Sequence, residues 1–217
     1  MSLALYSHPF SAYCQKVLVA LYENGTAFEY RTLEEKAFQE ELHAIWPFKL
    51  FPVLTDGPRP VRESSIIIEY LQQQHPGPVR LIPQDPEAAL EVRFMDRVFD
   101  NYVQTPMSSI VFNSLRPEDK RDPFGVERCR AQLDTAYSWL NEVMAARRWA
   151  AGAEFSMADC AAAPSLFYAD WVHPFGDRFP HLRTYRERLL ARPSFARAVD
   201  EARPFRHYFP LGAPDRD

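Results

Sequence analysis

The sequence predicts an α/β unit with the element order βαβαββα, followed by a unit built only of helices. Strand patterns occur only in the first third of the chain, a proline-rich segment follows them, and every later segment has helical periodicity. Strand signals that alternate with helical signals indicate a sheet covered by helices, whereas helical periodicity alone indicates a helix bundle. We therefore expect a first domain at residues 1–77, a linker at 78–86 and an all-helical second domain at 87–217.

The first domain starts with a βαβ pattern. Leu3–Tyr6 is a short apolar run typical of a buried strand, and residues 11–24 space their apolar side chains as a helix does. Residues 27–32 alternate apolar and polar side chains, which predicts a second strand, and a charged segment near 34–46 predicts a second helix. Such a unit is right-handed, with its two strands parallel.

A hairpin and a third helix complete the first domain. The Asp-Gly pair at 56–57 indicates a turn between short strands at 53–54 and 61–62. The segment ESSIIIEYLQQQ, residues 63–74, places its large apolar side chains on one helical face. Four prolines between residues 75 and 86 then prevent the helix from continuing.

The second domain is punctuated by prolines, and its segments have helical patterns only. Pro106 and Pro164 fall inside two predicted helices, and proline bends or interrupts a helix. Ser156 and Asp159 form a box of the S-x-x-D type, which predicts the start of a helix. Helices are predicted near residues 87–115, 124–149, 157–172, 180–192 and 194–203.

The composition is that of an ordinary soluble globular protein. Of the 217 residues, 47% are hydrophobic and 25% are charged, and the net charge is −4, so we expect no nucleic-acid partner. Cys14, Cys129 and Cys160 are too few and too scattered for a disulfide framework, and the chain has no CxxC pair for a dithiol or a metal site. The sequence shows no signal peptide and no apolar stretch of about 20 residues, which predicts a cytoplasmic protein without a membrane segment.

Four patches of the sequence, in the same order along the chain, resemble those of the cytosolic glutathione transferases, in particular the bacterial serine-type, zeta-, beta- and theta-like members. They are YSHPFSAYCQKVLVAL, WPFKLFPVLTDG, RESSIIIEYL and FSMADCAAAPSL. The resemblance implies a thioredoxin-like N-terminal domain, an all-α C-terminal domain and a homodimer. It also implies a detoxifying enzyme that conjugates the thiolate of glutathione, its co-substrate, to a small hydrophobic electrophile without a metal.

The second and third patches are similar to the family motifs N-P-x-G-K-V-P-x-L and E-S-x-A-I-x-x-Y-L, which hold glutathione. The resemblance implies a cis Pro52 that leaves the Val53 backbone free to pair with the extended tripeptide, a form of β-strand addition. It implies that Ser64 and the first amides of its helix hold the γ-glutamyl carboxylate, because a helix N-terminus favours an anion. Glu63 would then pair with the ammonium group, and Phe51 would line the same site.

Phe10 and Lys49 are predicted to contact glutathione as well. The family has Gly-Lys where this chain has Lys49-Leu50, so the lysine is displaced by one position. The resemblance implies that Lys49 binds the glycyl carboxylate, with Lys36 or His43 as alternatives. A solvated surface charge is an equally good account of each of them.

Ser11 is the candidate for activating the glutathione thiol. A free thiol has a pKa near 8.5, and lowering it by about two units requires roughly 2.7 kcal/mol of preferential thiolate stabilisation. One aimed hydroxyl at a helix N-terminus has about that strength. Ser11 lies where the first helix should begin, and it matches the first serine of the zeta-like pattern Y-S-x-x-x-S-S-C and the cysteine of the beta-class pattern S-P-x-A-C-S. The alternative is that Ser11 only caps the helix.

Neighbouring residues offer other assignments. Tyr6 matches the tyrosine of the alpha, mu and pi classes, but a core position at the strand end is the simpler account. Ser7 is a weaker option, one residue further on. Cys14 could form a mixed disulfide with glutathione, although a lone helical cysteine is more often a buried small hydrophobe. Omega-like members have a cysteine where this chain has His8, and we expect His8 to be a solvated turn residue.

The electrophile should bind between the first loop and the helical domain, in an aromatic-lined pocket of the kind that suits apolar or aryl compounds. The zeta motif continues with Ser-Cys where this chain has Ala-Tyr, which argues against maleylacetoacetate isomerase activity. The tail RPFRHYFPLG covers either this pocket or only the helical core. The predicted pocket residues are Tyr13, Tyr102, Thr105, Pro106, Phe112 and Phe167, with Phe10 and Ser109 as further candidates.

Two other functions are compatible with the sequence. One is a glutathione-dependent disulfide reductase or peroxidase that uses Cys14. The other is a non-catalytic homologue that binds glutathione or another ligand.

Overall fold

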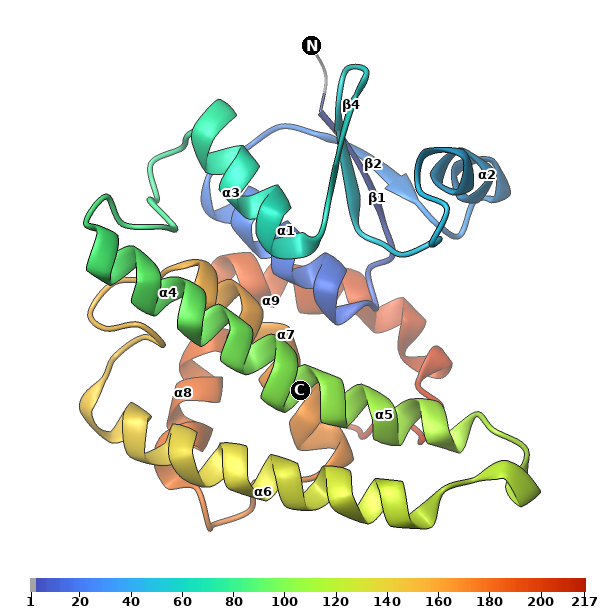
Figure 1. Ribbon diagram of the computed structural model, residues 1–217, viewed down its shortest axis with the longest axis vertical. Helices are drawn as coiled ribbons and strands as arrows, with labels where there is room; N and C mark the ends of the chain where they lie inside the picture. The colour runs from blue at the N-terminus through green and yellow to red at the C-terminus, as the bar shows by residue number, and fades with distance from the viewer. Residues whose placement is uncertain (1–2) are drawn as a thin grey trace.

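The computed structural model describes residues 3–217, with a sheet at one end and a helical half at the other (Figure 1). The strands are β1 (Leu3–Ser7), β2 (Glu29–Thr32), β3 (Val53–Asp56) and β4 (Arg59–Arg62). Their order in the sheet is β2-β1-β3-β4, with β1 and β2 parallel and the other neighbours antiparallel. The predicted order βαβαββα is therefore confirmed; the first two residues of the predicted domain, Met1 and Ser2, lie outside the described residues.

Helices cover both faces of the sheet (Figure 1). Leu5 points to one face, where it packs with side chains of α1 (Ala12–Glu23) and α3 (Ser64–Gln74). Tyr6 points to the other face, where it packs with side chains of α2 (Lys36–Ile45). This alternation follows from the period of two along a strand, and it directs Tyr6 away from the helical half.

The helical half is organised around one helix that is buried on every side. The helices are α4 (Pro86–Val98), α5 (Thr105–Ser114), α6 (Pro123–Ala146), α7 (Met157–Val172), α8 (Pro180–Leu190) and α9 (Pro193–Ala202). Every residue of α7 except the last is buried, and α1 packs against α7 and α9, which joins the two halves. Within residues 3–217, no helix combines the length and the apolar character that crossing a membrane requires.

The predicted helix near 87–115 is divided in the structure. A π-helical segment, Phe99–Gln104, separates α4 from α5. Pro106 follows in the first turn of α5 and has no N–H to donate, so the regular ladder cannot pass through it. The Thr105 hydroxyl instead donates to the Asp100 carbonyl oxygen at 2.9 Å. At Pro164, by contrast, α7 continues as one helix.

The segment between α3 and α4 is held by specific contacts to both halves. The Gln72 side chain donates to the Ile82 carbonyl and accepts from the Ile82 N–H, each at 2.8 Å. The neighbouring Leu81 carbonyl accepts from the Met157 N–H at the start of α7, also at 2.8 Å. Leu81 and Ile82 are both buried. Leu81 and Ile82 therefore anchor the otherwise largely exposed proline-rich segment to the core.

The predicted box at Ser156 and Asp159 begins α7. The Asp159 carboxylate accepts from the N–H and the hydroxyl of Ser156, at 2.9 and 3.0 Å. It also accepts from the Ala150 N–H at 2.8 Å and from the Tyr185 hydroxyl at 2.6 Å. One buried carboxylate thus fixes the start of α7 relative to α8 and to the loop before it.

Candidate functional site

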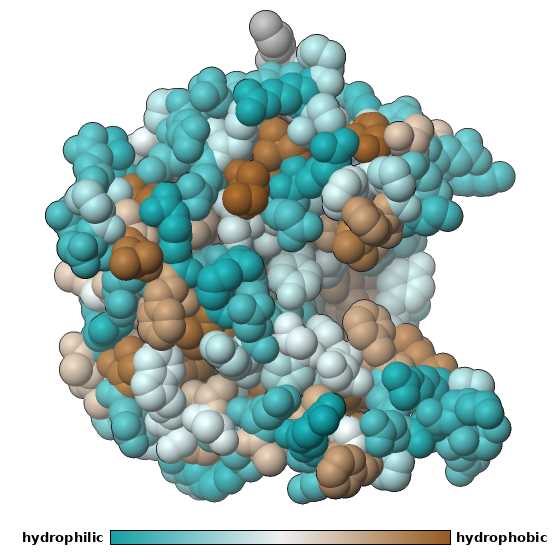
Figure 2. All heavy atoms as spheres, in the orientation of Figure 1, coloured by the Kyte–Doolittle hydropathy of each residue, from teal (hydrophilic) through white to brown (hydrophobic). Residues whose placement is uncertain are grey.

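Two cavities meet beside the start of α1. The first has a volume of about 690 Å³ and lies between the start of α3 and the helix α4. The second has a volume of about 630 Å³ and lies between the start of α1, the helix α5 and the C-terminal tail. They share Tyr13, Leu50 and Phe51 as common lining. Figure 2 shows the surface hollowed between the sheet-bearing half and the helical half, with apolar side chains around the hollow.

The sheet side of the first cavity carries most of the residues predicted to hold glutathione. Phe51, Pro52, Glu63 and Ser64 all line it. The Phe51–Pro52 peptide bond is cis, as the resemblance implies. Val53 follows directly as the first residue of β3, and its side chain is buried beneath the sheet surface. The binding role predicted for Val53 requires only its backbone.

Glu63 has an unusual backbone conformation at the edge of this cavity. Its φ is +68° and its ψ is 122°, at the position that caps α3. A side chain other than glycine is disfavoured there by about 1–3 kcal/mol, and such conformations cluster at functional sites. The conformation turns the chain so that Glu63 and the buried Ser64 both line the cavity. A carboxylate and a helix N-terminus thereby lie side by side.

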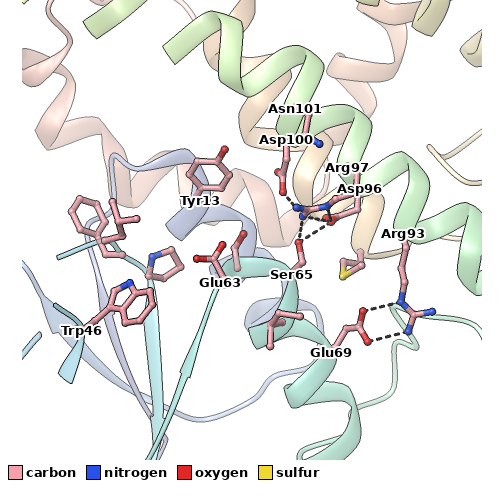
Figure 3. Close-up of a pocket in the computed structure, with 16 residues that line it drawn as sticks. Tyr13, Trp46, Glu63, Ser65, Glu69, Arg93, Asp96, Arg97, Asp100 and Asn101 are labelled. Carbon is pink, nitrogen blue, oxygen red and sulfur yellow. Dashed lines mark hydrogen bonds and ion pairs between the residues drawn. The ribbon is translucent and has the colours of Figure 1, made fainter. Parts of the chain in front are cut away.

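The opposite wall is a charged cluster that the sequence analysis missed. Figure 3 shows it across the cavity from Glu63 and Trp46. The Ser65 hydroxyl donates to Asp96 at 2.7 Å, and the Lys16 ammonium lies 2.6 Å from Asp96 and 2.8 Å from Asp100. Arg97 forms further ion pairs with both carboxylates, at 2.6 and 2.5 Å.

The cluster balances two cations against two carboxylates. Lys16 and Asp96 are almost completely buried, so each needs the other's charge. Burial raises the pKa of Asp100, and the Lys16 ammonium opposes that rise. A signal was present in the sequence, since Asp96 interrupts an apolar stripe that runs from Val92 in α4 to Phe99 in the π-helical segment. A carboxylate on a buried stripe predicts a partner, but not which residue provides it.

Ser11 lies two residues before Tyr13, the side chain that lines both cavities. It is the residue immediately before α1, it is partly exposed, and it lines the second cavity. Its N–H donates to the His8 carbonyl oxygen at 3.0 Å, which closes the turn before the helix. Within residues 3–217, its hydroxyl makes no capping hydrogen bond to α1. The hydroxyl is therefore not engaged in the structural role that was the alternative to thiol activation.

The other candidates for thiol activation lie in the protein core. The Tyr6 hydroxyl donates to Glu41 at 2.7 Å on the α2 side of the sheet, and burial raises its pKa. Cys14 is fully buried, and this burial raises the pKa of its thiol. Ser7 is fully buried, and its oxygen accepts from the Tyr30 hydroxyl at 3.3 Å. Among the described residues that line either cavity, these three candidates do not occur.

Tyr13 is the side chain that both cavities share next to Ser11. Burial, followed by the nearby negative charge of the Asp100 carboxylate, raises the pKa of Tyr13 to about 12. The phenol therefore stays protonated at neutral pH and can donate a hydrogen bond into either cavity.

The second cavity contains half of the residues predicted for the electrophile pocket. Tyr13, Thr105 and Phe112 line it, together with Phe10 and Ser109. The lining combines apolar side chains with hydroxyl and amide groups. Lining residues that the sequence analysis missed include Gln104, Met107, Ser108, Val111, Leu115 and Tyr168.

Tyr102, Pro106 and Phe167 lie elsewhere. Tyr102 is 61% exposed, because the π-helical segment changes which side chains face inward. Pro106 is buried, and Phe167 is buried in the helical core, 4.7 Å from the Trp171 ring. Thr105 and Met107, on either side of Pro106, and Tyr168, directly after Phe167, line the cavity instead.

The C-terminal tail packs back over the second cavity. Tyr208, Phe209 and Pro210 all line it. The Phe209 ring lies 5.3 Å from Trp171 and 6.3 Å from Phe10, measured between ring centroids. The tail thus covers the pocket and the helical core together, a question that the sequence left open.

The lysines and the histidine predicted for the glycyl carboxylate lie on the surface. Lys49 is exposed, with a φ of +58°. Lys36 is exposed and lies 3.6 Å from Glu40, and His43 is exposed. Among the described residues that line the first cavity, none of the three occurs. Trp46, which the sequence analysis passed over, lines the cavity at that end.

Two protein-family models match this chain, one in the sheet-bearing half and one in the helical half. The glutathione S-transferase N-terminal domain family matches residues 5–79, and the glutathione S-transferase C-terminal domain family matches residues 123–188. The chain is 31% identical to a glutathione S-transferase from Methylobacterium radiotolerans, whose crystal structure contains glutathione sulfonate. That match covers 92% of this chain and 95% of the other, with a TM-score of 0.79.

Two curated relatives match nearly the full length at lower identity. A probable maleylacetoacetate isomerase from Vibrio cholerae is 27% identical over 94% of this chain and 98% of its own. A stringent starvation protein A homologue from Haemophilus influenzae is 24% identical over 93% of this chain and 92% of its own. The thioredoxin-like first half, the all-helical second half and these matches show that the protein belongs to the glutathione S-transferase family.

Proposed function

We propose that the protein conjugates glutathione to a small, largely apolar electrophile, as a homodimeric cytoplasmic enzyme. One observation carries the proposal: a polar cavity and an aromatic-lined cavity share Tyr13, Leu50 and Phe51 as lining, and Ser11 lines the second cavity beside them. The polar cavity offers a carboxylate at Glu63 and a helix start at Ser64 for the two charges of the γ-glutamyl group. The relative that was crystallised with glutathione sulfonate supports glutathione as the ligand.

In the proposed reaction, the Ser11 hydroxyl donates a hydrogen bond to the glutathione thiolate. This bond lowers the thiol pKa, so that the thiolate is populated at neutral pH. The sulfur then attacks the electrophile in the second cavity, and the leaving group or the new negative charge develops there. The phenol of Tyr13 and the hydroxyl groups of the cavity wall provide donors for that charge.

The experiment measures glutathione binding by calorimetry and turnover across a panel of aryl halides, isothiocyanates, epoxides and maleylacetoacetate. For Ser11→Ala we expect a fall in kcat/KM of about 100-fold and a higher pKa of the bound thiol, with a similar Kd for glutathione. Ser109→Ala is the matched control for the thiol pKa, which it should leave unchanged, since it removes a different hydroxyl from the same cavity. Equal thiol pKa values in the parent and in Ser11→Ala would remove Ser11 from this role.

A second candidate function is glutathione binding without catalysis. It is favoured by the similarity to a stringent starvation protein A homologue, a name that states no reaction. Glutathione binding without turnover of any compound in the panel would support it. Absence of glutathione binding would reject both functions.

A further inference from the structure

The His8 imidazole lies where three segments of the chain meet. His8 stands in the loop before α1, and its side chain is only 16% exposed rather than solvated as expected. Its Nε2 atom lies 2.8 Å from a Glu34 oxygen in the loop between β2 and α2. Its ring also stacks edge-on against Phe205 of the C-terminal tail, at 5.0 Å between centroids.

The contacts of the ring specify its protonation state. The Phe10 N–H donates to Nδ1 of His8 at 3.1 Å, and an amide nitrogen can only donate. Nδ1 must therefore carry a lone pair, and the proton of the neutral imidazole sits on Nε2 and faces Glu34. Protonation at Nδ1 would place two N–H groups against each other and break the contact with Phe10.

His8 holds the backbone N–H groups of two later residues of the loop, Phe10 and Ser11. The His8 ring accepts from the Phe10 N–H, and the His8 carbonyl accepts from the Ser11 N–H. We propose that His8 is a positioning residue for thiol activation, because its neutral imidazole holds the Phe10–Ser11 loop so that the Ser11 hydroxyl meets the glutathione sulfur. This inference rests on the proposed function of Ser11.

Charged and polar groups from the neighbouring segments surround the ring. Glu34 attracts a protonated imidazole, and its own pKa is lowered chiefly by the His8 hydrogen bond. The Tyr208 hydroxyl donates to the same carboxylate at 3.0 Å, and His207 acts on Glu34 from the tail. On the side of α1, the Cys14 sulfur accepts from the His8 N–H at 3.4 Å and stays a neutral thiol. Glu34 therefore holds the Nε2 end of the ring, while the Phe10 N–H holds the Nδ1 end.

Two substitutions test the roles of the two ring nitrogens separately. In His8→Asn the amide oxygen takes the place of Nδ1 and accepts from Phe10, but it cannot be protonated. In His8→Gln the amide N–H takes the place of Nε2 and donates to Glu34, but the acceptor for Phe10 is lost. At pH 7.5, the ratio of thiolate to thiol in bound glutathione should be within about twofold of the parent value in His8→Asn. In His8→Gln the same ratio should fall about fivefold.

The pH profile gives a readout that a merely structural role would not move. At saturating glutathione, with chlorodinitrobenzene as the probe electrophile, the acid limb of kcat/KM reports the pKa of the bound thiol. That pKa should be the same in the parent and in His8→Asn and higher in His8→Gln, because only the Gln variant loses the acceptor for the Phe10 N–H. Equal thiol pKa values in the Asn and Gln variants would overturn the inference.

Hydrogen–deuterium exchange tests the geometry without glutathione. The Phe10 amide should be protected in the parent and in His8→Asn, and unprotected in His8→Gln, after correction for the intrinsic exchange rate. Melting temperatures of the three proteins check that each is folded. If the exchange pattern holds but Ser11→Ala leaves the bound thiol unchanged, the role of Ser11 fails while the loop contact stands; an unprotected Phe10 amide in the folded parent rejects the positioning role itself.

Discussion

The Lys16 ammonium lies 2.6 Å from an Asp96 carboxylate oxygen, and both side chains are almost completely buried between the two halves of the chain. Lys16 belongs to α1 and Asp96 to α4, so the pair joins the sheet-bearing half to the helical half. Ser65, at the start of α3, donates to the same carboxylate. The wall of the first cavity is therefore also the electrostatic contact between the halves.

Removal of the lysine should strongly destabilise the fold. Lys16→Met removes the buried cation of Asp96 and Asp100 and leaves them only Arg97, whose side chain is half exposed. Breaking a buried pair in this way costs about 3–5 kcal/mol of unfolding free energy. Urea unfolding followed by circular dichroism measures the change. Lys36→Met is the matched control, since Lys36 is exposed and its pair with Glu40 is 3.6 Å long; it should change stability by less than about 0.5 kcal/mol. A change below about 1 kcal/mol for Lys16→Met would contradict this account of the cluster.

Cys14 should be chemically inert in the folded protein. Its pKa is raised by burial, so its thiolate fraction at any pH is smaller than that of a free cysteine, whose pKa is near 8.5. Alkylation by iodoacetamide at pH 8 should therefore be slower by about 100-fold or more than in the unfolded chain. Mass spectrometry of the tryptic peptide measures the rate.

The matching variant is Cys14→Ala, which should keep transferase turnover within about threefold of the parent. Cys160→Ala is the control, because Cys160 is equally buried but lies in α7. Rapid alkylation of native Cys14, together with loss of a disulfide reductase activity in Cys14→Ala, would favour the redox alternative instead.

The parts of the site that follow from local pattern could be predicted from the sequence. The change from strand to helix around Ser11 is set by periodicity within about ten residues. The turn at Pro52 and the helix start at Ser64 are likewise local, and each has a recognisable motif. Such features depend on backbone preferences that neighbouring residues determine.

The parts that depend on packing between distant segments could not be predicted. Because α7 is buried on every side, periodicity gives no reason to choose Tyr168 over Phe167 as the residue facing the cavity. The π-helical segment likewise leaves Tyr102 exposed, although Thr105 directly after this segment lines the cavity as predicted. Phe209 reaches the cavity across a long sequence separation, which no local pattern encodes.

Phe209 should limit the size of the electrophile. Its ring closes the second cavity against Phe10 and Trp171, so Phe209→Ala enlarges the pocket. We expect KM for a small aryl halide to rise several-fold, and the relative kcat/KM for a bulkier homologue to increase. The buried ring should also cost about 3 kcal/mol of unfolding free energy on removal. Phe124→Ala removes a ring that is 78% exposed and should change neither quantity; an unaltered size preference in Phe209→Ala would show that the tail does not bound the substrate site.

The strained backbone of Glu63 should lower the stability of the protein, while its carboxylate should strengthen glutathione binding. Its φ of +68° is tolerated by glycine, so Glu63→Gly should raise the free energy of unfolding by about 1 kcal/mol, the strain released less the flexibility gained by the unfolded chain. Glu63→Gln keeps the strained backbone and removes only the charge, so its stability should equal that of the parent. Both variants should weaken glutathione binding about tenfold, because the ammonium group loses its charged partner. Calorimetry and urea unfolding on the same three proteins separate the effects: a destabilised Glu63→Gly would refute the strain, and an unchanged Kd in Glu63→Gln would refute the pairing with the ammonium group.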